Sequence, residues 1–328
     1  MRMTLLRPFL ALVAMCLAAF GLGGTLTVTS PTEDGYLGKN NTVSFNITGA
    51  SVQVSVKAVA TPTSGSSSPF TFTTTVTPDS DGKASGSLSL NFNEAAPEGA
   101  YTIVVSATEP NNSYASQTLN VTVDVTAPKF TELSPGTGGF FRSILHVRAV
   151  VEEANLDNWR VQINGLDVPN NTGQTNTISV DYDATGILSD GTQSVSIVVK
   201  DKAGNSSTKT LSMTLDRVRP TVQIVYPTAS TKISNGSAVT VLVDITDAST
   251  SSIDKTGIDV IAKKQDGTYI TRVTLVSLRS TSGTTQRWTG RIKYKKGQLP
   301  SKFVLSVSVY DRAGNAATLQ EVTAKYGK

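Results

Sequence analysis

A repeated segment with fixed proline spacing constrains the fold of this chain more than any other feature. An aspartate and two prolines keep the same spacing in two copies, which are Asp124, Pro128 and Pro135 in VDVTAPKFTELSP and Asp216, Pro220 and Pro227 in LDRVRPTVQIVYP. The last part has a third copy, TLTVTSP, ending at Pro31. Proline fixes φ and removes a backbone donor, which suits a strand boundary. Each copy predicts the end of one domain, a linker, and the first strand of the next.

A second recurring unit has the form Asp-x-Ala-Gly-Asn. It closes SVSIVVKDKAGN at Asn205 and LSVSVYDRAGN at Asn315. The aspartate can accept hydrogen bonds from amides just ahead of it, and Gly204 and Gly314 can adopt positive φ. The unit therefore predicts one hairpin per domain, joining its last two strands. The first domain has EPNNSY instead, with Glu109 in the place of the aspartate.

Apolar residues alternate with polar ones on either side of these motifs. Alternation with a period of two indicates strands that bury one face, and several such strands separated by turns predict a two-sheet sandwich. The predicted core-facing positions are Val43, Phe45, Ile47, Val52, Val54, Val56, Ile103, Val105 and Ala107 in the first domain, Leu145, Val147, Ala149, Val151, Trp159, Val161, Ile163, Val195, Ile197 and Val199 in the second, and Val239, Val241, Val243, Ile245, Ile258, Val260, Ala262, Leu305, Val307 and Val309 in the third.

The hairpins and the VDVTAP linker resemble those of tandem bacterial immunoglobulin-like domains of secreted and cell-surface proteins. The resemblance implies an all-β fold of three tandem immunoglobulin-like β-sandwich domains, placed at residues 25–126, 127–218 and 219–328. For the first domain, which lacks the hairpin motif and carries TPTSGSSSPF, fibronectin type III is the nearest competing sandwich. Such domains serve as spacers, stalks, adhesive modules or appendages to enzymes.

The N-terminal 24 residues have the parts of an export signal. Arg2 and Arg7 precede the apolar run FLALVAMCLAAF, and small residues follow it. This pattern predicts a cleaved signal peptide at 1–24 and an extracellular or cell-surface protein with no transmembrane span in its mature chain; an uncleaved anchor is the alternative. Cys16 is the sole cysteine, and Met15 stands before it where a lipoprotein signal needs a small residue, so lipid anchoring there is not expected.

Few side chains offer catalytic chemistry. His146 is the single histidine, and it falls on the polar side of its strand. The acidic groups Glu152, Glu153 and Asp157, and Asp181 with Asp183, allow an acid/base pair or a calcium site, against the commoner alternative of solvated carboxylates. Asp124 and Asp216 lie at domain junctions, where loop oxygens suit calcium, but no EF-hand or cadherin-type motif surrounds them. We therefore expect no catalytic residue and no cofactor, with calcium left open.

The positive charge is concentrated at the C-terminal end. Residues 219–328 hold 16 basic and 7 acidic side chains, against 3 and 8 in 25–126 and 8 and 10 in 127–218. Five of the basic residues cluster in QRWTGRIKYKKGQ, namely Arg287, Arg291, Lys293, Lys295 and Lys296. They form either a contact for an anionic polymer or an ordinary solvated strand with Trp288 and Ile292 turned to the core.

The sequence thus favours a secreted or cell-surface structural or adhesive protein, built as a rod and without catalytic activity. A carbohydrate-binding or accessory module of an extracellular enzyme system is the alternative, and a hydrolase using two carboxylates fits least. The expected partner is an anionic cell-envelope polymer or another surface protein, with no specific nucleic acid.

Overall fold

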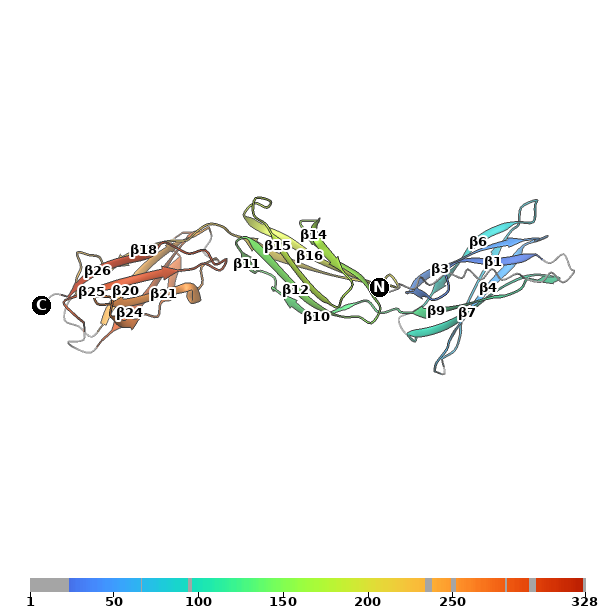
Figure 1. Cartoon of the computed structure of the whole chain (residues 1–328), viewed down its shortest axis with the longest axis horizontal. Helices are drawn as coiled ribbons and strands as arrows, with labels where there is room; N and C mark the ends of the chain where they lie inside the picture. The colour runs from blue at the N-terminus through green and yellow to red at the C-terminus, as the bar shows by residue number, and fades with distance from the viewer. Residues whose placement is uncertain are drawn as a thin grey trace, which may run out of the picture. The chain divides into compact units, whose positions relative to one another are not determined.

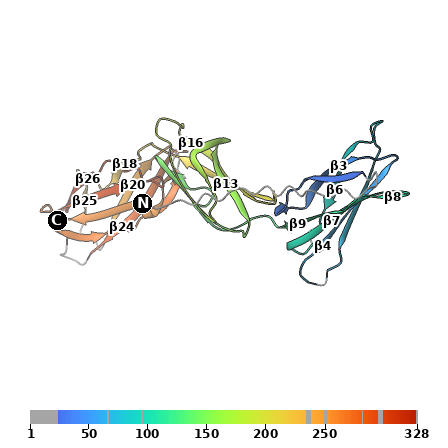
Figure 2. The same cartoon turned by 45° about the vertical axis from the view of Figure 1, so that its right-hand side comes forward.

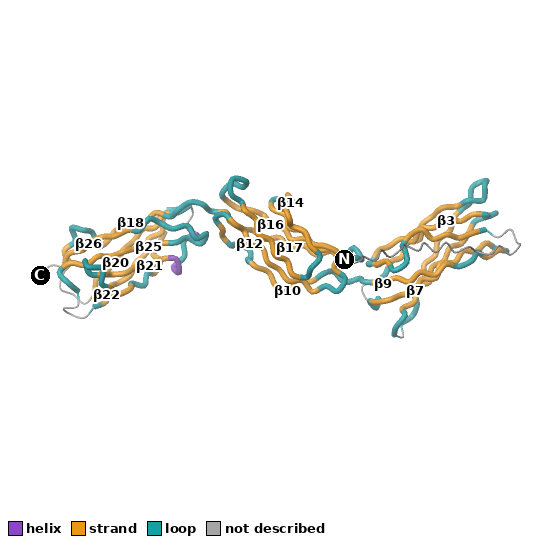
Figure 3. Tube along the Cα trace, viewed as in Figure 1, coloured by secondary structure: helices purple, strands orange, loops and turns teal. Residues whose placement is uncertain are grey.

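The computed structural model describes residues 24–65, 67–93, 96–233, 238–248, 252–280, 282–294 and 299–326 of the 328-residue chain. These residues are mainly β-strands joined by turns, with a short 3-10 helix, η2 (Lys255–Gly257) (Figure 3). The chain divides into two compact units, 1–126 with 203–205 and 127–202 with 206–328. The predicted signal peptide at 1–24, with Cys16, lies outside the described residues apart from its last position.

The first unit contains one sandwich, whose strands appear in blue to green in Figure 1. A three-stranded sheet has the order β1-β3-β6, and the facing sheet has the order β2-β9-β7-β4-β5, with β8 paired to β7. The strands are β1 (Thr25–Ser30), β2 (Gly35–Leu37), β3 (Asn40–Thr48), β4 (Val54–Pro62), β5 (Phe70–Val76), β6 (Ala84–Asn91), β7 (Gly99–Glu109), β8 (Asn112–Ser113) and β9 (Gln117–Val123).

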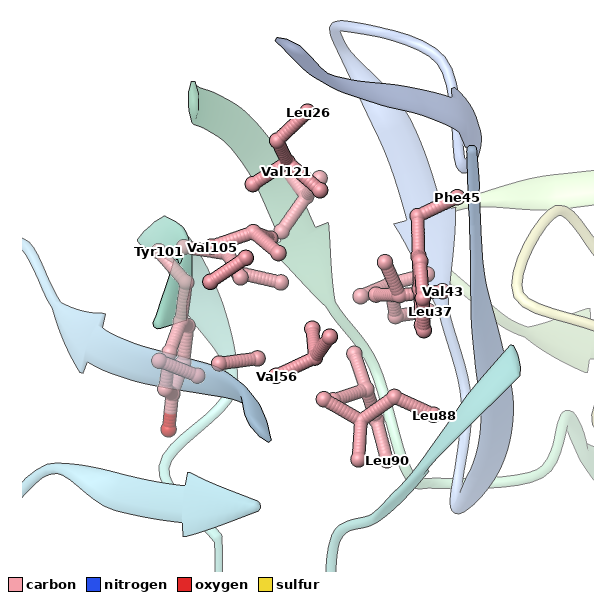
Figure 4. Close-up of a cluster of buried hydrophobic side chains, with 14 of the residues drawn as sticks. Leu26, Leu37, Val43, Phe45, Val56, Leu88, Leu90, Tyr101, Val105 and Val121 are labelled. Atoms are coloured by element: carbon pink, nitrogen blue, oxygen red, sulfur yellow. The ribbon is translucent and has the colours of Figure 1, made fainter. Parts of the chain in front are cut away.

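The core of this sandwich comes from the inward faces of both sheets. In Figure 4, Val43 and Leu88 from one sheet and Val56 and Val105 from the other point into the space between them. Most predicted core positions of this domain are confirmed, because strict alternation carries their side chains inward. The prediction that Val52 faces the core is wrong, because this residue precedes β4 and is 49% exposed.

Tyr101, near the start of β7, ties the chain back on itself. Its hydroxyl donates to the Pro97 carbonyl at 2.8 Å, while its ring is only 1% exposed. A tyrosine early in the penultimate long strand that bonds four residues upstream is the tyrosine corner of immunoglobulin-like sandwiches. The ring therefore fills the core while its polar end fixes the turn into β7.

The second unit contains two further sandwiches. The second sandwich pairs β10-β12-β15 with β11-β17-β16-β13-β14. Its strands are β10 (Lys129–Ser134), β11 (Phe140–Phe141), β12 (Ile144–Glu152), β13 (Leu156–Ile163), β14 (Leu166–Gly173), β15 (Thr177–Asp183), β16 (Gly191–Asp201) and β17 (Ser206–Leu215). Its own hydrophobic core includes all the predicted inward residues of this domain, among them Trp159.

The third sandwich pairs β18-β20-β24-β23 with β19-β26-β25-β21-β22 (Figures 1 and 2). Its strands are β18 (Thr221–Tyr226), β19 (Lys232–Ile233), β20 (Ala238–Thr246), β21 (Ile258–Lys263), β22 (Tyr269–Arg272), β23 (Val276–Ser280), β24 (Thr285–Lys293), β25 (Lys302–Val309) and β26 (Gln320–Tyr326). Trp288 and Ile292 face its core, as predicted.

The sheets repeat two features. Each first strand, β1, β10 or β18, carries a register shift and ends at a cis proline bond, before Pro31, Pro135 or Pro227. In each sandwich a two- or three-residue strand (β2, β11 or β19) pairs in parallel with the last long strand. The all-β, tandem immunoglobulin-like fold is confirmed, while the boundaries proposed at 126/127 and 218/219 stay predictions.

Candidate functional site

Three buried carboxylates meet in the second unit, where β17, β20 and β25 end. Asp216 directly follows β17 of the second sandwich, Asp247 directly follows β20, and Asp311 lies two residues beyond β25. Their side chains are 3%, 4% and 6% exposed, and one carboxylate oxygen from each lies within 4.8 Å of the others. We call these three residues the junction cluster.

Local hydrogen bonds hold each carboxylate in place. Asp311 closes its hairpin by accepting from the amide and the Nδ2 of Asn315, at 2.8 Å each, and Gly314 takes a φ of 84°. Asp247 accepts from the Ala248 amide at 2.8 Å and the Ser252 hydroxyl at 2.7 Å. One oxygen of Asp216 accepts from the Val218 amide at 3.0 Å.

The junction cluster would place up to three negative charges in a buried position if all its carboxyl groups were ionised. None of its members forms an ion pair with any residue that the structure describes. Burial raises the pKa of both the Asp216 and the Asp247 carboxyl, and the neighbouring carboxylates push these pKa values further up. Buried carboxylates without a cationic partner are costly to ionise, so this arrangement either holds protons or attracts a positive ion.

An acid/base role fits the junction cluster poorly. A cavity of about 310 Å³ borders Asp216 and is also lined by Asp190, whose Oδ1 is paired with Arg217 at 2.7 Å. A glycosidase needs two carboxyl groups that flank the sugar bond and can reach it. Side chains as buried as these cannot contact such a substrate, whereas oxygen ligands for a metal need no such access.

The acidic groups singled out in the sequence are in structural contacts. Asp181 on β15 accepts from His146 Nδ1 at 2.8 Å and from Arg148 at 2.6 Å; His146 and Asp181 are exposed and Arg148 is half-buried. Asp183 accepts from the Thr185 amide at 2.9 Å. His146 thus lies on the polar face, as expected.

The remaining predicted acidic residues are similarly engaged. Glu152 pairs with Lys129 at 3.4 Å, and Glu153 accepts from the Asn155 amide at 2.7 Å. Asp157 accepts from the Nδ2 of its neighbour Asn158 at 2.7 Å. Asp124, in the first unit, is buried and accepts from the Thr126 amide at 3.3 Å.

Of the junction cluster, the sequence pointed to Asp216 as a possible calcium ligand and to Asp311 only as a turn residue. Asp247 was missed, although a signal was present. The inward positions of β20 alternate up to Ile245, and Asp247 is the next step of the same alternation; Asp311 likewise continues the inward row of β25. In both strands the acidic residue that continues the core-facing row past the strand end is buried.

The predicted basic cluster is divided by the structure. Arg287 donates from Nε and Nη2 to the two oxygens of Asp244, each at 2.7 Å, and this carboxylate raises the pKa of Arg287. Arg291 and Lys293 are exposed on the same face of β24 and form no ion pair with a described residue. Lys295 and Lys296 lie outside the described residues.

Aromatic side chains give little sign of a sugar-binding platform. Both tryptophans, Trp159 and Trp288, are buried. The strongly exposed aromatic residues of the described ranges are Tyr269, on β22, and Tyr310, which directly follows β25. No helix in the described ranges has the length and hydropathy needed to cross a membrane.

Comparison with known proteins agrees with the fold. Residues 175–326 match the bacterial Ig-like domain (group 3), and no curated protein matches the chain. Fibronectin(III)-like modules of CbhA from Clostridium thermocellum are 14% identical, with a TM-score of 0.40 over 61% of this chain and 93% of theirs. A tetra-tandem repeat from the extending region of a large adhesion protein is 18% identical, with a TM-score of 0.30 over 93% and 74%. Similarities this distant support no conclusion about a ligand or partner of this chain. The chain is built from immunoglobulin-like domains, and its residues 175–326 are similar to the bacterial Ig-like domain of group 3.

Proposed function

We propose that this protein is exported and acts outside the cytoplasm as a non-catalytic structural or adhesive chain of immunoglobulin-like sandwiches. The export-type pattern of residues 1–24 and the similarity of residues 175–326 to the bacterial Ig-like domain support the location. The structural contacts of His146 and the exposed carboxylates support a role without chemistry, because each is committed to holding a strand or a turn.

The single observation that carries the proposal is the use of the hairpin motif itself. Asn315, its last residue, is 7% exposed and donates through Nδ2 to the backbone carbonyl of Asp216 at 2.9 Å. Two further contacts join the same places: Arg142 donates to the Gly314 carbonyl at 3.3 Å, and the Arg312 guanidinium lies 4.7 Å from the centre of the Phe140 ring. The residues that recur in the sequence therefore serve to fasten consecutive sandwiches within the second unit, which suits a spacer or stalk.

Attachment would come from the basic face of the third sandwich. Arg291 and Lys293 are exposed and unpaired among the described residues, within a region of net charge +9. Positive surface charge of this kind attracts anionic polymers of the cell envelope, and the attraction weakens with salt.

Location is tested by fractionating the producing cells with an antibody against the chain and by treating intact cells with protease. We expect the chain in the medium or surface fraction, accessible to protease, with the N-terminal segment removed. Retention in the cytoplasmic fraction with an intact N-terminus would refute the proposal.

Attachment is tested by binding of the purified chain to isolated envelopes across a salt series. We expect binding at low ionic strength that is lost above roughly 0.5 M salt, and weaker binding by the double variant Arg291→Gln with Lys293→Gln. The matched control is Lys200→Gln with Lys209→Gln, which removes the same charge from exposed positions of the second sandwich. Equal losses in both double variants would show that no particular face is used.

A further inference from the structure

We propose that Asp216, Asp247 and Asp311 together bind one divalent cation of the calcium class, joining the second sandwich to the third. The proposal goes beyond the structural role above and does not depend on where the protein is located. According to the proposal, the junction cluster binds a metal ion, and the stability of the second unit depends on that ion.

The spacing of the oxygens suits a calcium-sized ion. Calcium binds oxygen ligands at about 2.3–2.6 Å, so two ligands on opposite sides of one ion are at most about 4.6–5.2 Å apart. The junction cluster offers one oxygen from each carboxylate, all within 4.8 Å of one another. An ion equidistant from three oxygens that are all 4.8 Å apart would lie about 2.8 Å from each, so a shift of a few tenths of an ångström at most brings all three to calcium-binding distance.

Asp216 supplies an independent sign of a missing partner. Its side chain is 3% exposed, and its Oδ1 accepts from the Val218 amide. Its other oxygen, Oδ2, accepts no hydrogen bond from any residue that the structure describes. A carboxylate oxygen without a protein partner is costly in a side chain this buried, because little solvent can reach it from the bordering cavity. A cation bound by the three residues would supply that partner.

The charge balance points the same way. Three carboxylates lie together with no ion pair to a described lysine or arginine, and the nearby Arg217 is paired with Asp190. A divalent ion would offset most of this charge, because bound cations are often the largest local charges in a site and favour ionised carboxylates around them. The cavity that borders Asp216 has a volume of about 310 Å³, enough for the water ligands that complete six- to eightfold calcium coordination.

The alternative is that the junction cluster carries protons and needs no metal. The two cases differ in what Asp216→Asn does, because asparagine keeps the oxygen for the Val218 amide and replaces only the oxygen without a partner. If a cation binds, the variant loses a ligand. If protons suffice, the variant is harmless under all conditions.

The test uses the full chain, freed of metal with EDTA. Calcium binding is measured by isothermal titration calorimetry on the wild type and on Asp216→Asn. We expect the variant to bind one calcium ion fewer per chain, or to bind it at least tenfold more weakly. Asp167→Asn, which removes the same charge from an exposed position of the second sandwich, should bind as the wild type does.

Thermal unfolding of the second unit gives the second readout. A hundredfold excess of calcium over its Kd should raise the wild-type Tm by roughly 5–10 °C, and this shift should be absent in Asp216→Asn. In EDTA the variant should be as stable as the wild type or more so, since a buried negative charge is gone. Asp247→Asn, which can keep its contacts to Ala248 and Ser252, should behave alike if Asp216→Asn folds poorly. Absence of calcium binding by the wild type, or equal binding by the wild type and both variants, would overturn the proposal.

Discussion

The contribution of Asn315 to the second unit can be worked out from its contacts. Asn315→Ala removes two hydrogen bonds made by Nδ2, one of 2.9 Å to the Asp216 carbonyl and one of 2.8 Å to the Asp311 carboxylate. The turn bonds of its backbone, from its amide to Asp311 Oδ1 and from the Asp311 amide to its carbonyl, are kept. The loss is therefore confined to the contacts that the side chain makes.

The expected destabilisation is about 2–4 kcal/mol. A neutral hydrogen bond contributes about 0.5–1.5 kcal/mol and one to a charged group about 1.5–3 kcal/mol. Solvent cannot replace them easily, because Asn315 is 7% exposed. For a unit of this size, each 1 kcal/mol lowers Tm by roughly 2–4 °C.

The assay is urea unfolding in EDTA, followed by tryptophan fluorescence. The chain has two tryptophans, Trp159 and Trp288, and both are buried in the second unit, so the signal reports on that unit alone. The matched control is Asn176→Ala, an exposed asparagine whose Nδ2 donates to the Glu153 carbonyl at 2.8 Å. We expect the control to stay within about 0.5 kcal/mol of the wild type. If Asn315→Ala changes stability no more than the control does, the hairpin does not fasten the two sandwiches in the way described.

Three further predictions concern individual contacts. Tyr101→Phe should destabilise the first unit by about 1–3 kcal/mol, because the Pro97 carbonyl loses the hydroxyl that donates to it, as measured by thermal unfolding followed by circular dichroism. Gly173→Ala should cost about 1–3 kcal/mol in urea unfolding, because the new Cβ would lie 2.5 Å from the Trp159 ring; a wild-type midpoint would refute this. The amide of Val52 holds the pKa of Glu109 below its usual value, so its stabilisation is present above the pKa of a free glutamate and is lost as pH falls through the lowered one. Glu109→Gln should accordingly lower Tm at neutral pH, with the difference from wild type closing in acid.

Much of the fold is predictable because alternation and turn chemistry are local properties of the sequence. The rows Leu145 to Val151 and Val239 to Ile245 face their cores because a strand of period two has no other way to bury them. The prediction for Val52 is wrong for a physical reason. The chain there is not yet a strand, since the amides of residues 51 and 52 are bonded to the Glu109 side chain and not to a ladder.

The candidate site was only partly predictable, because its members come from distant parts of the chain. Asp216 and Asp311 are 95 positions apart in number, and their proximity depends on how two sandwiches meet. The contacts of Arg287 were likewise not predictable, because the sequence alone indicates no ionic partner for it. Its partner Asp244 lies directly opposite on β20, a cross-strand pairing that composition does not reveal.

The short parallel strands have a mechanical consequence. In each sandwich β2, β11 or β19 runs in the same direction as the last long strand beside it. When the two ends of a domain are pulled apart, parallel neighbours slide lengthwise, so that their hydrogen bonds carry the force at the same time. An antiparallel hairpin pulled from its open end would instead lose its bonds one after another. Each sandwich is therefore built to resist traction along the chain, at the cost of only two or three residues in the strand that bears it.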